Sequence, residues 1–403
     1  MEYFNQNSSL FEITENYPQT LKVFISNGFN QLADELKRQT FGKALQLGIA
    51  LNMRQLDYDA FRDELVDAIE SKGGVADNQI NHTNELNIKG LLPCPVRIPL
   101  QEGLDGFLEE LRQQGAAIST DMKSASMGLD WIKEEVFAAK KAADLDDIYV
   151  SAGFDMFFED AYFGRFIKSG DFHNPLKWNN INKSFHSNIQ LIDPQNRFGI
   201  IAVVPAVFLV NTAILGDRPV PQSWYDLLNP VYERSISLPV SDFDLFNAIL
   251  LTLKQKYGME AIAALGRNML QSMHPAQMVK SERQKENRPA VTIMPNFFTK
   301  MVKEGSAMKA VWPSDGAIIS PIFMIGKSNS TAEQDKVADF FGGLPVAEIL
   351  SHQGLFPSLH PQIDNRLPSD AKFMWLGWDF INNNNLNQAF DECHKVFNNN
   401  QLV

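Results

Sequence analysis

The spacing of apolar residues divides the chain into a helical first part and a longer part in which strands and helices alternate. In residues 10–71 apolar positions recur at helical intervals, as in "DYDAFRDELVDAIE", which follows this rule behind a capping aspartate. From Leu86 onward, "DDIYVSAG", "FGIIAVVPAVFLVNT" and "AVTIMP" predict buried strands, and "LQEGLDGFLEELRQQG" predicts an amphipathic helix. This alternation favours an α/β fold with a mostly parallel sheet that helices cover on both faces.

The boundary between the two parts has the composition of a linker. The stretch "SKGGVADNQINHTN" is rich in Gly, Asn and Ser and has no periodicity. We therefore expect a small helical domain over residues 1–75 and a linker over residues 76–85. The total of 403 residues fits two or three domains.

Composition and charge narrow the classes of partner and the compartment. The net charge of −12 argues against nucleic acid and anionic membranes as main partners, since both attract clustered Lys and Arg. The longest apolar stretch is interrupted by Pro205 and Asn211, which indicates a buried strand and not a membrane span. The first residues lack the basic and apolar segments of a secretory signal, and the two cysteines are far apart in sequence. We expect a cytoplasmic protein with reduced thiols.

The sequence contains none of the common catalytic or cofactor-binding motifs. Its seven histidines form no pair with the spacing of a zinc site, and there is no phosphate-binding glycine loop, nucleophile elbow or dinucleotide fingerprint. We therefore predict no metal site, no cofactor and no enzymatic activity.

Four segments from Leu86 to the end resemble a known family. They are "VPAVFLVNTAIL", "VPQSWYDLLNPVYERSISLP", "VWPSDGAIISPIFMIGK" and "KVADFFGGLPVAEILSHQGLFPSLHP". In this order they resemble the type II solute-binding proteins of ABC importers, in particular the branch of ferric-ion binders and their small-anion relatives. The resemblance implies the two-lobe periplasmic-binding-protein type II fold, with ligand held between the lobes. Lobe one would comprise residues 86–204 and 315–403, and lobe two residues 205–314.

The helical part resembles a second family. Residues 18–29 follow the pattern Pro-x-x-x-x-Val-Phe-x-x-x-Gly-Phe of a small helical domain of unknown function that is found fused to redox and iron–sulfur-associated proteins. Members of that family often carry a cysteine pair after the glycine, and "FNQLADEL" has none. We therefore predict a docking module for a protein partner and no redox role.

Two adjacent phenylalanines occupy a position that the resemblance makes informative. In ferric-ion binders a pair of tyrosines follows a strand of lobe two, close after an Asn, and supplies oxygens to iron. Here "MPNFFTK" stands at that position, and Phe297 and Phe298 carry no oxygen, whereas Fe(III) requires anionic oxygen ligands. This predicts an organic ligand with an apolar face. The alternative is that both rings pack beneath the following helix.

Further candidate residues lie where predicted strands end, because ligands of open α/β sheets bind there. Arg97 and the free amides of the helix after it could hold a carboxylate or phosphate, or Arg97 could pair with a surface carboxylate. Cys94 lies between two prolines at this helix start, which favours its thiolate, or it is a small buried side chain. Ser241 or Asp242 could contact the ligand or cap a helix. The predicted ligand-binding residues are Cys94, Arg97, Lys123, Ser124, Ser126, Ser151, Gly153, Ser241, Asp242, Asn296, Phe297, Trp312 and Asp315.

These observations lead to three hypotheses. The first is non-catalytic binding of a small organic ligand with an acidic group, by a substrate-binding protein of an ABC importer or by a cytoplasmic sensor or carrier derived from one. The second is a cytoplasmic enzyme on the same fold, with Cys94 as its nucleophile. The third is an exported binder that uses a non-standard route. An iron- or metal-binding solute-binding protein is a further alternative.

Overall fold

The computed structural model describes most of the chain. The described residues are 3–26, 29–53, 56, 58–70, 85–125, 128–152, 154–185, 189–240, 243–272, 288–303 and 305–401. Among them no helix is long and apolar enough to cross a membrane.

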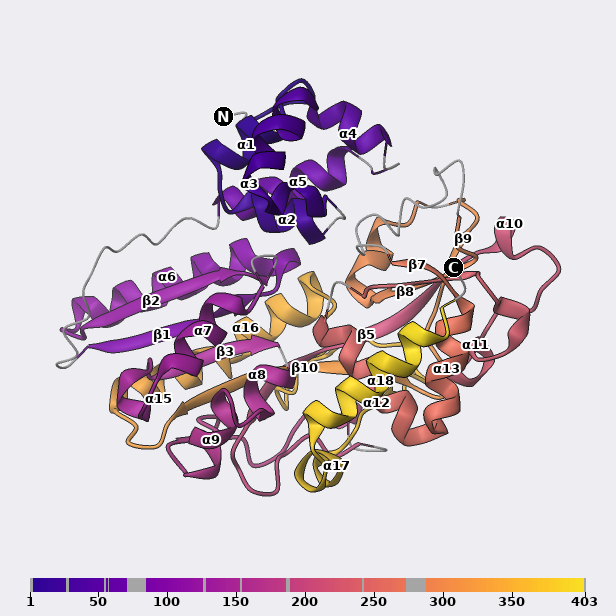
Figure 1. Ribbon diagram of the computed structural model, residues 1–403. Coiled ribbons are helices and arrows are strands. Elements are labelled where there is room, and N and C mark those ends of the chain that lie inside the picture. The colour runs from indigo at the N-terminus through magenta and orange to yellow at the C-terminus, as the bar shows by residue number, and fades with distance from the viewer. Residues whose placement is uncertain are drawn as a thin grey trace.

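Residues 3–70 form helices around a core of their own, as predicted (Figure 1). Phe24, Phe29 and Phe61 lie at its centre, with ring centroids 5.3–6.1 Å apart. The hydroxyl of Ser9 accepts a hydrogen bond from the amide of Glu12 and caps the first helix. The helices are α1 (Leu10–Asn16), α2 (Thr20–Ser26), η1 (Asn30–Ala33), α3 (Glu35–Lys37), η2 (Arg38–Gly42), α4 (Leu47–Met53) and α5 (Tyr58–Glu70).

Residues 1–70 are expected to fold as an isolated fragment, because the buried residues of this core all lie between Phe4 and Ile69. Circular dichroism of the fragment should show helix that melts cooperatively, and a fragment of residues 85–403 should melt separately. A fragment 1–70 without helix would show that the rest of the chain is needed to hold it.

The remainder of the chain builds one eleven-stranded sheet with the order β2-β1-β3-β10-β5-β8-β6-β7, and β4, β9 and β11 pair beside this path. The strands are β1 (Leu86–Leu92), β2 (Ile118–Ser124), β3 (Ile148–Ala152), β4 (Phe172–His173), β5 (Gly199–Asn211), β6 (Ile236–Leu238), β7 (Met269–Ser272), β8 (Val291–Pro295), β9 (Met308–Val311), β10 (Ala317–Lys327) and β11 (Phe373–Met374).

The expectation of a mostly parallel sheet is wrong. The pairs β1–β2, β1–β3 and β6–β8 are parallel, but the long strands β5 and β10 pair antiparallel with each other and with their main neighbours. A long apolar run indicates a buried strand without indicating its direction. Because β5 and β10 are shared, hydrogen bonds join the two halves of the sheet, and the bounds of the two predicted lobes stay a prediction.

Helices cover both faces of the sheet. They are η3 (Cys94–Val96), α6 (Arg97–Gln113), α7 (Asp130–Ala138), η5 (Ala142–Asp144), α8 (Phe154–Phe158), α9 (Phe163–Lys168), η6 (Lys183–Phe185), α10 (Thr212–Leu215), α11 (Trp224–Leu227), η7 (Pro230–Tyr232), α12 (Phe243–Tyr257), α13 (Met259–Asn268), η9 (Asn296–Met301), α15 (Ala332–Phe341), α16 (Leu344–Glu348), η10 (Ile349–Gln353), α17 (Trp378–Asn383) and α18 (Leu386–Asn399).

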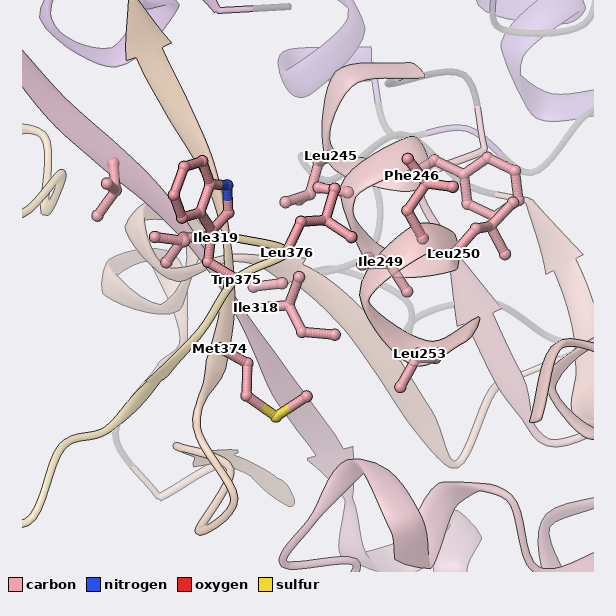
Figure 2. Packing of buried hydrophobic residues seen from close by; sticks show 14 of the residues in the cluster. Leu245, Phe246, Ile249, Leu250, Leu253, Ile318, Ile319, Met374, Trp375 and Leu376 are labelled. Carbon is pink, nitrogen blue, oxygen red and sulfur yellow. The ribbon is translucent and has the colours of Figure 1, made fainter. Parts of the chain in front are cut away.

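Two clusters of buried side chains lie on opposite faces of the sheet, since neighbouring residues of β10 alternate between them. Ile322 and Met324 belong to the cluster with α6, and Phe323 and Ile325 belong to the larger cluster with α12. In the larger cluster, side chains of α12 lie close to Ile318 and Ile319 of β10 and to the segment Met374–Leu376 (Figure 2). These two cores hold the strand ends that are described next.

Candidate functional site

Strand ends from the two halves of the sheet approach each other along β5. Ala152, the last residue of β3, pairs with Ile322, which pairs with Ala202 of β5. Strand β8 runs in the direction opposite to β3, and its last residue, Pro295, pairs with Ala206 of β5. The two ends are therefore four residues apart along β5 (206 minus 202), or about 13 Å at the rise of a strand. We call the region between these ends the candidate site.

The first half of the sheet brings two of the predicted residues together. Cys94 follows β1, Ser124 ends β2, and the Cys94 Sγ lies 3.3 Å from the Ser124 Oγ. Ser124 is fully buried, and Cys94 is half-buried and is not in a disulfide. The 3₁₀ turn of Cys94 leads directly into α6, whose first residue is the half-buried Arg97. These three side chains therefore come from one corner of the fold.

Lys123 lies on the other face of the sheet, because successive residues of a strand point in opposite directions. Its ammonium group is 3.5 Å from an Asp121 oxygen and 3.5 Å from the centre of the Trp131 ring. From the sequence, Lys123 and Ser124 were predicted to bind the ligand together. In the structure their side chains lie on opposite faces of the sheet. The side chain of Ser151 also points away from Cys94 and Ser124. It is buried, and its hydroxyl donates a hydrogen bond to the carbonyl of Ala152 at 2.7 Å.

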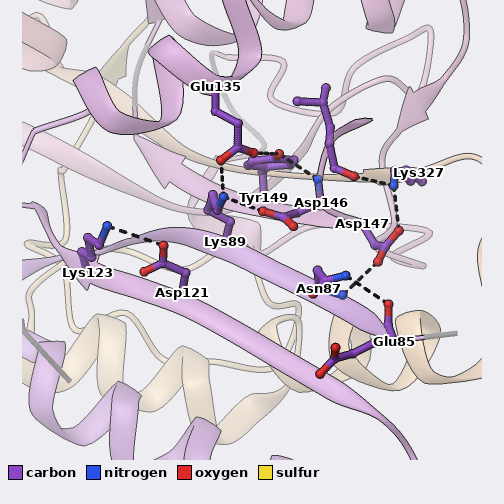
Figure 3. Close-up of polar contacts among 11 residues, drawn as sticks. Glu85, Asn87, Lys89, Asp121, Lys123, Glu135, Asp146, Asp147, Tyr149 and Lys327 are labelled. Atoms are coloured by element: carbon purple, nitrogen blue, oxygen red, sulfur yellow. Dashed lines mark hydrogen bonds and ion pairs between the residues drawn. The ribbon is translucent and has the colours of Figure 1, made fainter. Parts of the chain in front are cut away.

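A buried group of charges that the sequence did not indicate lies near Lys123 (Figure 3). The Lys89 ammonium contacts Glu135 and is 2.7 Å from Asp146, and the Tyr149 hydroxyl donates to Glu135 at 3.1 Å. Burial lowers the pKa of Lys89, but the attraction of Asp146 and Glu135 outweighs it and the pKa is raised. Burial, Asp146 and Glu135 together raise the pKa of Tyr149 well above its usual value. A lysine inside an apolar strand was the only signal available in the sequence.

In the second half of the sheet the two phenylalanines contact each other but pack into different groups of buried side chains. Their rings meet edge to face at 5.4 Å, with an angle of 81° between their planes. Phe297 packs in the cluster of α6, with its centroid 6.5 Å from that of Phe356, and Phe298 packs against Leu209, Met294 and Met308. Both rings are half-buried, so only part of each is open to a ligand. Asn296 precedes them, and its carbonyl accepts a hydrogen bond from the Thr299 hydroxyl at 2.7 Å.

Trp312 and Asp315 have structural partners elsewhere in the fold. Asp315 accepts hydrogen bonds from the amide of Trp224 at 3.0 Å and from the hydroxyl of Tyr257 at 2.8 Å. Burial and then Asp315 raise the pKa of Tyr257 far above its usual value. The indole nitrogen of Trp312 donates to the carbonyl of Lys372 at 2.9 Å. The contacts of Asp315 connect the segment before β10 to α11 and α12, and none of these contacts brings Trp312 or Asp315 to Cys94.

Four predicted residues, Ser126, Gly153, Ser241 and Asp242, lie outside the described residues. Within the described part of the chain, no three His, Cys, Asp or Glu side chains are grouped so that they could hold a metal ion. Two cavities of about 470 and 380 Å³ lie away from the candidate site, the first beside Asn87 and Lys327 and the second beside Phe107 and Phe340. The positions of the strand ends, and not these cavities, therefore define the site.

Solved structures with the same fold include ferric ion-binding proteins and ABC transporter proteins. Apo ferric ion-binding protein A from Pasteurella haemolytica matches with a TM-score of 0.55 and 13% identity, covering 78% of this chain and 99% of that chain. An ABC transporter protein from Clostridium perfringens matches with a TM-score of 0.55 and 16% identity, covering 78% and 100%. Iron-bound HitA from Pseudomonas aeruginosa matches with a TM-score of 0.52 and 12% identity, covering 78% and 99%. At these identities the likeness shows the fold alone.

Family models match both parts of the chain, while the curated proteins contain no match. The model of a domain of unknown function (DUF1858) matches residues 4–61, which are most of the helical domain. The model described as bacterial extracellular solute-binding protein matches residues 143–384, which are more than half of the chain and contain every strand from β3 to β11. Both resemblances inferred from the sequence are thus confirmed, and the chain belongs to the family of bacterial extracellular solute-binding proteins.

Proposed function

We propose that the chain binds a small organic molecule with an acidic group between the two halves of its sheet, without changing it chemically. The observation that carries this proposal is the approach of the ends of β3 and β8 at the centre of the fold. One side offers the Arg97 guanidinium at the start of α6, and a guanidinium suits an anionic group. The other side offers the half-buried ring of Phe297, which suits an apolar group.

A screen of metabolites by thermal shift tests this proposal. Any compound that raises the melting temperature is then measured against Arg97→Ala, which should bind it about ten- to a hundred-fold more weakly, since a charge-assisted hydrogen bond contributes roughly 1.5–3 kcal/mol. Arg97→Lys keeps the charge but loses the planar guanidinium, so its affinity should lie between those of the parent and Arg97→Ala. Equal affinity in all three proteins would remove Arg97 from the site. Mass spectrometry of the bound compound after incubation distinguishes binding from catalysis, because a chemically altered compound would indicate an enzyme.

Ferric iron is expected not to bind tightly, although one of the proteins with this fold described above is named for ferric ion and another was solved with iron bound. The rings at positions 297 and 298 carry no oxygen to coordinate Fe(III). Adding ferric citrate to the purified protein should give no visible charge-transfer band. A band in the unmodified protein would contradict this expectation. Phe297→Tyr combined with Phe298→Tyr is the comparison that reports whether phenolates alone can restore affinity.

We further propose that the protein acts in the cytoplasm as a sensor or carrier, with residues 1–75 contacting a protein partner. Cys94 and Cys393 are not joined in a disulfide, which fits a reducing compartment. Burial raises the pKa of the Cys393 thiol to about 11, which makes it a poor nucleophile at neutral pH. Fractionation of cells tests the location. Recovery in the periplasm or medium would instead favour a substrate-binding protein that serves an ABC importer directly.

A further inference from the structure

The two central strands of the sheet each carry a proline where its halves meet. Pro205 of β5 pairs with Ile319, and Pro321 of β10 pairs with Val203. Proline has no N–H to donate to a ladder and is normally confined to edge strands and bulges. The register of the same strand pair also shifts between Ile322 and Phe323. The backbone hydrogen bonding between β5 and β10 is therefore weakest where the halves of the sheet meet, and bending the sheet costs least there.

A set of contacts spans this weak point on the side of α6. The Lys300 ammonium of η9 donates hydrogen bonds to the carbonyls of His352 at 3.0 Å and Gln353 at 2.8 Å. These carbonyls end η10, and a cation is favourable at the C-terminal end of a helix. Phe297, also in η9, packs beside Phe356 with 26° between their ring planes.

The two sides of this contact are anchored on opposite sides of the prolines. The acceptor side is fastened to the first part of β5, because Val203 donates to the Pro357 carbonyl at 3.0 Å and the Ser358 hydroxyl donates to the Ile201 carbonyl at 3.0 Å. The donor side continues directly from β8, which pairs with β5 over residues 206–210. Any bending at Pro205 must therefore change the separation of η9 and η10.

We propose that Lys300 and Phe297, with the carbonyls of His352 and Gln353 and the ring of Phe356, form a latch that holds the two halves of the sheet together without a ligand. When the latch opens, the halves bend about Pro205 and Pro321. Because η10 also packs against η3, which carries Cys94, opening separates η9 from the corner of the candidate site. The latch does not depend on which ligand the site takes.

The distance between two spin labels tests the latch in the full chain. Labels at Asp105 of α6 and Glu260 of α13, both exposed, report on the two halves in a background of Cys94→Ser and Cys393→Ala. The parent should give one narrow distance distribution. Lys300→Met should lower the ratio of closed to open molecules about two- to five-fold. Adding Phe297→Ala should make a second population, displaced by more than about 2 Å, predominant.

Lys303→Met is the matched control, since Lys303 is an exposed lysine close to Lys300 that makes none of the latch contacts. It should give the parent distribution. Unchanged distances in both latch variants would overturn the proposal, and so would an equal change in the control. Lys300 is exposed, so Lys300→Met should retain the parent melting temperature within a few degrees, and this variant keeps the test decisive if Phe297→Ala unfolds. The distance and melting-temperature measurements use no ligand, so a result that overturns the latch does not bear on the proposed function.

Discussion

Replacing Gly90 by alanine is expected to lower the free energy of unfolding by about 3 kcal/mol or more. A Cβ atom at this position would lie 2.0 Å from the carbonyl oxygen of Val150, far inside van der Waals contact. The strands cannot easily separate, because β1 pairs with β2 on one side and with β3 on the other, and β3 also pairs with β10. Urea unfolding of the full chain measures the effect as a lower midpoint.

Gly106→Ala provides the control for this substitution. Gly106 lies within α6, where an added Cβ would have no atom within 4 Å. Alanine is the better helix former, so this variant should be more stable by up to about 1 kcal/mol. Equal midpoints for the two variants would mean that the sheet adjusts to the extra methyl group. The difference matters for the candidate site, because β1 leads directly into the turn of Cys94.

The parts of the fold that depend on local pattern could be predicted from the sequence. Continuous apolar runs predicted β3 and β5, helical spacing predicted α6, and the phenylalanine pair was correctly placed after a strand that is now β8. The helical domain was also correctly separated from the sheet. Each of these features is decided by neighbouring residues, by strand or helix periodicity, or by a short motif.

The parts that depend on long-range pairing could not be predicted. Asp315 was expected to face a ligand, but it accepts hydrogen bonds from Trp224, 91 residues earlier, and from Tyr257. Lys123 and Ser124 are adjacent in sequence and point to opposite faces of β2, and no strand was predicted over residues 118–124. The direction of β5 relative to β10 also follows from tertiary pairing, which the apolar run of each strand does not encode.

The buried charges around Lys89 give the last prediction (Figure 3). Lys89→Met is expected to lower the free energy of unfolding by about 3 kcal/mol at neutral pH, because it leaves Asp146 and Glu135 without their shared cation. The side chain of Asp146 is 8% exposed, so water cannot replace the lost ammonium group. Urea unfolding at pH 7 measures the loss. In a double-mutant cycle with Asp146→Leu, the second substitution should cost much less in Lys89→Met than in the parent.

Lys123→Met is the matched control, since Lys123 lies on the same face of the sheet but pairs with a carboxylate that is 37% exposed. It should cost less than about 1 kcal/mol. The pH dependence distinguishes the ion pair from simple packing. Because the pKa of Lys89 is raised on folding, its stabilisation is complete below the unfolded lysine pKa of about 10.4 and is lost as the pH rises through the folded value. The difference between the parent and Lys89→Met should therefore stay constant from pH 7 to about pH 9.5 and shrink at higher pH. A difference that persists unchanged above pH 11 would mean that Lys89 stabilises the fold through its aliphatic chain.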